Sequence, residues 1–295
     1  MFLLLIVTIF SIVSCNNTKK IDNQSERIGV EFFKRNEYQK ALPFLIKAAD
    51  SGSIDASRYL GEIYQNGGEI KKDYQQSFKW FLKAAEKGDK KSISMVAASY
   101  YLGKGVEQNY KEAFRWLLKA SEKIDETAPT KSDVLLMTLI AGRYYVGQGT
   151  LQDFGEAAKW ARRAAELGDA EAQVMLSFFL FSGQGVLQNK TEARQWAEKA
   201  AEQNYPEGFM MLGMLNEFPP ADHHTDMKEA VKWYRKASER DIHVASLQLA
   251  RLYEGGKGVD KDMKQSLRYY KLAAEQGNKE AVEKLETLAG TNVTR

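Results

Sequence analysis

Apolar and polar residues alternate along most of this chain with the period of an α-helix. Ala56, Leu60 and Tyr64 follow one another at intervals of four residues, which places all three on one face of a helix. Trp80 and Ala84 are spaced in the same way in the segment that follows. The chain contains only five prolines in 295 residues, so few positions oppose helix formation. The pattern predicts an all-α protein.

The same helical pattern returns at a nearly constant interval. One position is tyrosine in four of six copies, and leucine or asparagine in the other two: Tyr64, Tyr100, Tyr144, Leu180, Asn216 and Tyr253. These positions are 36, 44, 36, 36 and 37 residues apart, so the unit is 36 residues with one insertion of eight and one of a single residue. Each copy has the pattern of two helices, and one helix pair cannot bury its apolar face alone. The period therefore predicts a stacked array of helix pairs.

Glycine pairs end the first helix of most copies, and a short acidic or amide residue precedes the second helix. The pairs are Gly103/Gly105, Gly147/Gly149, Gly183/Gly185 and Gly256/Gly258. Glycine adopts the positive φ angles that end a helix and turn the chain. The short polar residues can cap free N–H groups of the second helix: Asp73, Asn109, Asp153, Asn189 and Asp262. A phosphate-binding loop follows a strand, whereas these glycines follow helices, so their role is structural.

The combined pattern is Leu-Gly-x-x-Tyr, Gly-x-Gly-Val, Asp or Asn, Ala-x-x-Trp and Ala-Ala-x-x-Gly, and it extends from Ala56 to Gly277. It resembles the Sel-one-like repeat (SLR) family, which is related to the tetratricopeptide repeats. The resemblance implies a right-handed superhelical solenoid of about seven antiparallel helix pairs plus a C-terminal capping helix. It also implies a scaffold or adaptor that binds a protein or peptide partner, although fold alone does not establish function.

The segments on either side of the repeats predict the rest of the organisation. Residues 26–54 resemble a tetratricopeptide hairpin and would cap the array, six Sel-one-like repeats occupy 55–278, and 279–295 would form a capping helix and tail. Two polar insertions interrupt the register, at 121–134 and at 217–227. Insertions into a regular array often carry binding specificity.

The N-terminus has the pattern of a targeting signal. Residues 1–14 are an apolar run that is too short to span a bilayer. The segment Ile12-Val13-Ser14-Cys15 resembles the lipobox of bacterial lipoproteins, which implies a lipid on Cys15, the only cysteine. No Lys or Arg precedes the run, which departs from the usual signal. Residues 15–25 would form a polar tether, so we expect a lipid-anchored protein of the bacterial cell envelope that faces the periplasm or exterior. The outer membrane is slightly favoured, because residue 16 is asparagine and not the aspartate that often signals retention in the inner membrane.

The charge distribution and the absence of a nucleophile motif argue against nucleic-acid binding and against catalysis. The net charge is +3, from 42 basic and 39 acidic residues mixed along the chain, so we expect no nucleic-acid partner. No nucleophile motif is present, and we expect neither enzymatic activity nor a cofactor. The alternative is a cell-wall (peptidoglycan or penicillin-like) binder or hydrolase, which would need a carboxylate of raised pKa in a cleft. Cysteine-rich relatives linked to penicillin binding carry paired cysteines, and this chain has none.

Two groups of residues are candidate sites. Tyr101, Tyr145 and Phe181 each follow the repeat position described above by one residue, so they could form a partner-binding aromatic ladder or belong to the core between repeats. His223 and His224 lie among aspartates, but two adjacent histidines seldom bind one ion without a third ligand. We therefore expect no metal site.

Overall fold

The structure is a computed structural model, and it describes residues 23–221 and 224–291. Within these ranges every regular element is an α-helix. Residues 23–34 are helical, and the following helices are α2 (Tyr38–Asp50), α3 (Ile54–Asn66), α4 (Tyr74–Glu86), α5 (Lys90–Leu102), α6 (Tyr110–Ser121), α7 (Lys131–Val146), α8 (Phe154–Glu166), α9 (Ala170–Ser182), α10 (Lys190–Glu202), α11 (Pro206–Glu217), α12 (Met227–Ser238), α13 (His243–Gly255), α14 (Met263–Glu275) and α15 (Lys279–Thr291). Among the described helices, none combines the length and hydropathy that a bilayer-spanning segment requires.

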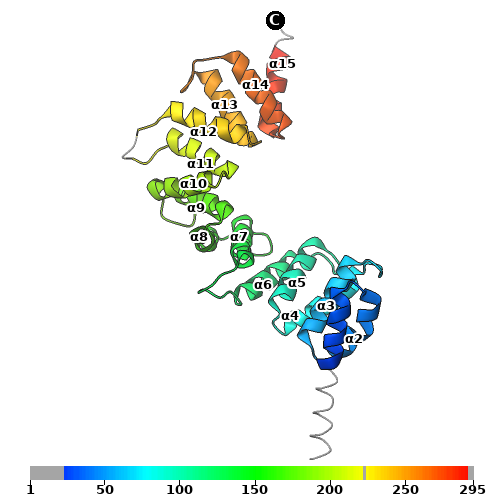
Figure 1. Ribbon diagram of the computed structural model, residues 1–295. Helices are drawn as coiled ribbons and strands as arrows, with labels where there is room; N and C mark the ends of the chain where they lie inside the picture. Colours follow the sequence, from blue (N-terminus) through cyan, green and yellow to red (C-terminus); the bar gives the residue numbers. More distant parts are fainter. Residues whose placement is uncertain (1–22, 222–223, 292–295) are drawn as a thin grey trace, which may run out of the picture. The chain divides into compact units, whose positions relative to one another are not determined.

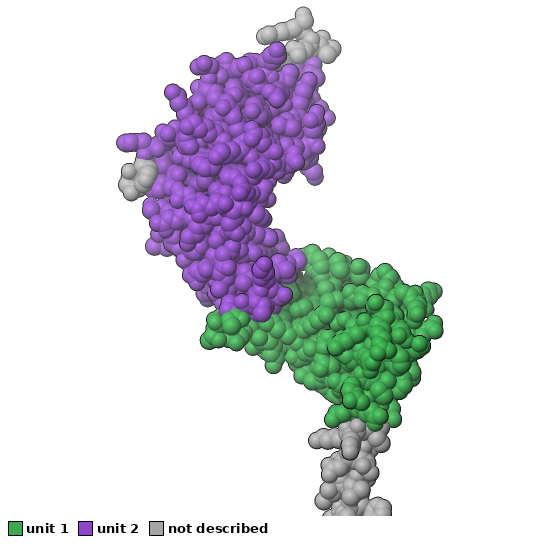
Figure 2. Space-filling model, in the orientation of Figure 1, with its two compact units in different colours: residues 1–128, 148–150 green, residues 129–147, 151–295 purple. Residues whose placement is uncertain are grey.

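The chain divides into two compact units, which Figure 2 shows in different colours. Unit 1 comprises residues 1–128 and 148–150, and unit 2 comprises residues 129–147 and 151–295. The division falls at the insertion that follows α6, where the regular spacing of the repeats is interrupted.

Unit 1 is built from consecutive antiparallel helix pairs (Figure 1). Helix α3 packs against α4, α4 against α5, and α5 against α6. The apolar side chains expected at helical spacing form its core, and Leu45, Leu60 and Ile63 are completely buried. Their burial removes apolar surface from water, which is the main favourable contribution to folding.

Unit 2 continues the same arrangement. Its pairs are α7/α8, α9/α10, α11/α12 and α13/α14, and α15 packs against α14 at the end of the chain. The first helices of successive pairs also contact one another, since α9 touches both α7 and α11. Tyr234 and Leu249 are fully buried in one of its cores. The predicted all-α array of helix pairs with a C-terminal helix is therefore confirmed.

The predicted caps lie at the helix ends. Asn109 and Asp153 begin α6 and α8, and each side chain accepts a hydrogen bond from the backbone N–H three residues later, at 3.0 and 2.9 Å. Gly183 ends α9 with φ of 74°, in the left-handed region. Gly185 lies against the first turn of α8, where a Cβ atom would be 2.1 Å from the carbonyl carbon of Phe154. Only glycine allows this contact between the turn of one copy and the second helix of the copy before it.

In the altered copy around residues 217–227, the first helix, α11, ends without a glycine turn. Pro219 stands where most other copies have the first glycine, and Phe218 follows the last residue of α11. Arg194 Nη2 donates a hydrogen bond of 3.0 Å to the carbonyl oxygen of Leu215, which satisfies one of the free acceptors at this end. The Asp226 side chain then caps α12 by accepting from Glu229 N at 2.9 Å.

Candidate functional site

The three aromatic residues singled out from the sequence share one local position, in the last turn of a first helix. The rings of Tyr101 and Tyr145 lie close to an aromatic ring at the start of the following second helix, and Phe181 lies beneath a lysine there. The pairs are Tyr101 with Tyr110 at 5.3 Å, Tyr145 with Phe154 at 5.8 Å, and Phe181 with Lys190 Nζ at 5.3 Å. Each residue therefore packs within its own copy, and a local contact alone does not make any of them a binding residue.

Tyr145 differs from the other two because it also borders a groove. Its ring meets Phe178 and Phe179 edge-on, at centroid distances of 6.2 and 5.7 Å. The groove has a volume of about 290 Å³ and lies within unit 2 on the first helices α7, α9 and α11. We call it the first-helix groove, and its lining residues are Tyr145, Val174, Met175, Phe178, Phe179, Glu207, Met210 and Met211.

The first-helix groove has a buried floor and an accessible rim. Phe179, Met210 and Met211 are no more than 9% exposed, whereas the side chain of Tyr145 is 36% exposed. All of its lining side chains are apolar or aromatic except Glu207. Methionine is flexible and polarisable, so a methionine-rich surface adapts its shape to an apolar partner.

Two glutamates stand at one end of the groove. Glu171 and Glu207 precede Met175 and Met211 by four residues, so each lies one turn away on the same helix face. Among the described residues, neither glutamate has a hydrogen-bonded or ion-paired partner. Partial desolvation, and then the charges of Asp169 and Glu207, raise the pKa of the Glu171 carboxyl.

The same negative charge acts on a neighbouring tyrosine. Burial raises the pKa of Tyr205 to about 12, and the carboxylates of Glu207, Glu171 and Asp169 add to this shift. A positive group placed here would relieve the repulsion between these carboxylates. The rim therefore favours a cationic ligand group next to the apolar floor.

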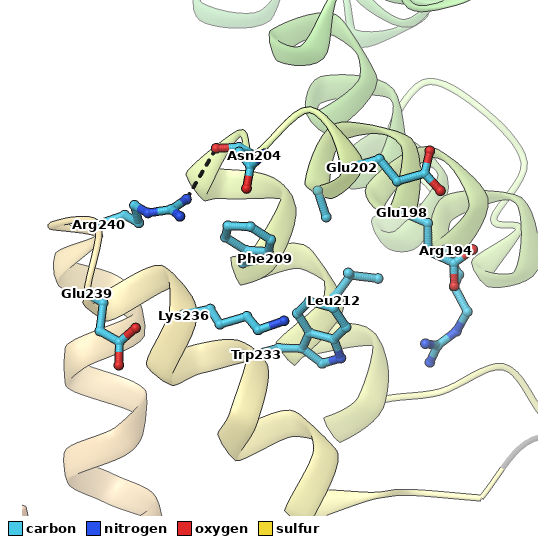
Figure 3. A pocket seen from close by; sticks show the side chains of 11 residues that line it. Arg194, Glu198, Glu202, Asn204, Phe209, Leu212, Trp233, Lys236, Glu239 and Arg240 are labelled. Atoms are coloured by element: carbon cyan, nitrogen blue, oxygen red, sulfur yellow. Dashed lines mark hydrogen bonds between the residues drawn. The ribbon is translucent and has the colours of Figure 1, made fainter.

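A larger cleft lies elsewhere in unit 2, between the second helices α10 and α12 and above α11 (Figure 3). Its volume is about 600 Å³. The rings of Phe209 and Trp233 stack at its base, with centroids 5.9 Å apart and planes 15° apart. We call it the second-helix cleft.

The tryptophans of the second helices have a common structural role. Each is followed three residues later by a lysine or arginine whose charge lies over the indole ring, at 3.8 to 4.8 Å from the ring centroid. The pairs are Trp80–Lys83, Trp116–Lys119, Trp160–Arg163, Trp196–Lys199 and Trp233–Lys236. The contact recurs in five copies, so it belongs to the repeat itself.

The chemical candidates from the sequence have different outcomes. Cys15 and His223 lie outside the described residues. His224 is exposed, and the described part of the chain contains no group of three or more His, Cys, Asp or Glu side chains that could hold a metal ion. Glu171 has the raised pKa that a hydrolase would need, but among the described residues no nucleophile or base is hydrogen-bonded to it.

Sequence reasoning missed most of the groove. Phe178, Met175 and Met210 were not identified as candidates, although the fifth copy contains the unusual run Phe209-Met210-Met211. A second signal was the recurrence of glutamate at the second position of two successive first helices, Glu171 and Glu207.

Comparison with known protein families gives a match along most of the chain. The model of the Sel1 repeat family matches seven segments, which are 29–53, 54–89, 91–125, 137–169, 170–205, 211–242 and 243–278. The first of these overlaps the hairpin predicted to be tetratricopeptide-like. No curated protein matches the chain significantly.

Two solved structures have similar folds. One is a protective antigen present in uropathogenic Escherichia coli strains, which displays an SLR fold; it is 29% identical, with a TM-score of 0.69 over 90% of this chain. The present chain spans only 56% of the length of that protein. The other is a Sel1 repeat protein from Oxalobacter formigenes, which is 26% identical with a TM-score of 0.56, and the alignment covers 84% of this chain and 98% of that one.

Proposed function

Because this chain belongs to the Sel1 repeat family, whose members generally serve as protein–protein interaction scaffolds, we propose that it is a non-catalytic scaffold of the bacterial cell envelope. In this proposal a lipid on Cys15 anchors the protein, and unit 2 binds a protein partner through the first-helix groove. The E. coli relative is a protective antigen, which fits a chain carried at the cell envelope.

The first-helix groove is the observation that carries the proposal. It brings apolar side chains from three successive first helices onto one accessible surface, and Tyr145 and Phe178 form its edge. An amphipathic helix places its apolar face into a groove of this kind. The unpaired carboxylates of Glu171 and Glu207 favour a partner helix with lysine or arginine beside its apolar face.

Site-specific crosslinking tests the groove. A photoreactive phenylalanine analogue at position 178 should capture the partner in intact cells, and mass spectrometry would identify it. The change Tyr145→Ala should lower recovery of that partner at least about tenfold, because tyrosine is among the residues that most often contribute the largest share of binding energy at an interface.

Tyr101→Ala and Phe181→Ala are the matched controls. Both residues share the local position of Tyr145 but do not line the groove. If all three changes lowered recovery equally, the aromatic ladder would be the binding surface instead of the groove. If none did, the partner would bind elsewhere and the groove proposal would be wrong.

The anchor requires a separate test. Growth with an alkyne-labelled fatty acid, followed by membrane fractionation, should place the wild-type chain in the membrane fraction with its label. Cys15→Ser should lose the label and leave the membrane, because a single cysteine carries the proposed lipid. Unlabelled wild-type protein would contradict the anchor without affecting the groove.

A further inference from the structure

The second-helix cleft carries opposite charges on its two walls. Helix α10 contributes Glu198 and Glu202, which are four residues apart and so share one face (Figure 3). Helix α12 contributes Lys236, and the turn that follows α12 contributes Arg240. Arg194 also lies on the α10 side, where its guanidinium donates to the carbonyl oxygen of Leu215, and Glu239 also lies on the α12 side. The α10 side, called the acidic wall, thus has one more acidic than basic group, and the α12 side, called the basic wall, has one more basic than acidic group.

The two walls do not neutralise each other. Among the described residues, neither Glu198 nor Glu202 forms an ion pair with Lys236 or Arg240. The Lys236 ammonium lies 4.2 Å from the Trp233 ring centroid, and the Arg240 guanidinium lies 5.4 Å from that of Phe209. Arg240 Nη1 donates one hydrogen bond of 3.4 Å to the carbonyl oxygen of Asn204, which leaves its other donors available.

The residues that distinguish this cleft are those that depart from the repeat. Phe209 occupies a position that other copies fill with smaller or unbranched side chains: Ser57, Ile93, Met137, Gln173 and Ser246. Glu198 occupies a position that is apolar or basic in the other copies: Leu82, Leu118, Arg162, Arg235 and Lys271. Trp233, Lys236 and Glu202 stand at positions that repeat in other copies, so Phe209 and Glu198 are the two departures that make this cleft specific to this part of the array.

The base of the cleft provides an apolar surface. Phe209 is 6% exposed and Leu212 is 2% exposed, while Trp233 is half-buried and borders the opening. An apolar or aromatic side chain of a ligand can pack on these three residues. The volume of about 600 Å³ lies within the range of ligand pockets.

We propose that the second-helix cleft binds a short peptide with a free amino terminus, a free carboxyl terminus and an apolar side chain. The α-carboxylate lies against Lys236 and Arg240, where charge-assisted hydrogen bonds are available. The α-ammonium lies against Glu198 and Glu202, and the apolar side chain packs on Phe209 and Trp233. The site is separate from the first-helix groove, so this inference does not depend on the proposed scaffold function.

Titration calorimetry with blocked peptides tests the proposal. The probe is the dipeptide leucyl-phenylalanine, compared with its N-acetylated and its C-amidated forms. Blocking either end should weaken binding about tenfold or more, because each block removes a charge-assisted contact. Equal binding of the three forms, or no measurable binding of the free dipeptide, would overturn the proposal.

Variants assign each end of the peptide to its wall. In Lys236→Gln/Arg240→Gln, the free and amidated dipeptides should bind equally, whereas acetylation should still weaken binding. In Glu198→Gln/Glu202→Gln, acetylation should lose its effect and amidation should keep it. All four side chains are exposed, so these changes leave the core intact.

Matched controls come from the repeat itself. Lys199 and Glu166 occupy the positions of Lys236 and Glu202 in other copies but do not line the cleft. Lys199→Gln and Glu166→Gln should leave the affinity of the free dipeptide unchanged. A loss of affinity in these controls equal to that of the wall variants would show a general charge effect and overturn the proposed site.

Discussion

Gly213 on α11 lies so close to Tyr234 on α12 that a Cβ atom at residue 213 would be 2.5 Å from Cδ1 of the tyrosine ring. Tyr234 is completely buried, and its hydroxyl donates a hydrogen bond of 2.8 Å to Glu217 Oε2. Gly61 and Phe81 form the same relationship in unit 1, with 2.6 Å between the corresponding atoms. A large ring on the second helix is thus accommodated by a missing side chain on the first.

The first prediction concerns this size relationship. Gly213→Ala should lower the free energy of unfolding by about 1–3 kcal/mol, because the added methyl group overpacks the core against the Tyr234 ring. Chemical denaturation would measure the change. The control is Gly142→Ala on α7, where a Cβ atom meets no neighbour within 4 Å and the helix should gain about 0.5–1 kcal/mol. Equal losses in both variants would contradict the explanation.

The second prediction concerns the turn between copies. Gly185→Ala should destabilise unit 2 by about 1–3 kcal/mol more than Gly168→Ala, as measured by thermal or chemical unfolding. Both glycines have positive φ, 71° and 92°, so both changes carry backbone strain. Only at Gly185 would the new Cβ atom collide with the backbone of Phe154, whereas Gly168 has no atom within 4 Å. Similar losses would mean that the close approach contributes little.

The third prediction follows from the raised pKa of Glu171. A carboxyl whose pKa is raised by folding favours the protonated state, so its contribution to stability is present below the ordinary value of 4.5 and is lost as pH rises through the folded value. Glu171→Gln should therefore raise the melting temperature at pH 7 and have a smaller effect at pH 4. Because the side chain is exposed, we expect less than about 1 kcal/mol. A destabilised variant at pH 7 would contradict the repulsion at the rim.

The fourth prediction concerns the attachment of α15. Glu254 accepts a hydrogen bond from Tyr270 Oη at 2.6 Å and one from Lys284 Nζ at 3.0 Å, so it joins α13 to both α14 and α15. These two donors lower the pKa of Glu254, with Tyr270 the larger cause. The stabilisation is present above the ordinary value of 4.5 and is lost as pH falls through the lowered value.

Amide hydrogen exchange measures this attachment. Glu254→Gln should increase the exchange rate of α15 amides at pH 7, and the difference from wild type should shrink in acid. Glu280→Gln is the control, since it removes an exposed ion pair with Arg251 between the same two helices, α13 and α15. If both variants exchanged alike, Glu254 would not be the main link between α13 and α15.

Much of the fold followed from local patterns in the sequence. The caps at Asn109 and Asp153 lie at the expected helix starts because a capping hydrogen bond spans only three residues. The helix pairs follow from the spacing of apolar residues such as Leu60 and Tyr64, which depends on neighbours within two turns. Neither feature requires knowledge of a distant part of the chain.

The sequence by itself determined the repeat, the helix pairs and the family, because the same short-range pattern of residues recurs in each copy. It could not separate Tyr145 from Tyr101 and Phe181, which occupy one repeat position. Only the tertiary structure placed Tyr145 beside Phe178 on the next first helix, and set the charged side chains of α10 across one cleft from those at the end of α12. The physical reason is that a groove is made by side chains from several copies at once, and these vary where the repeat does not constrain them.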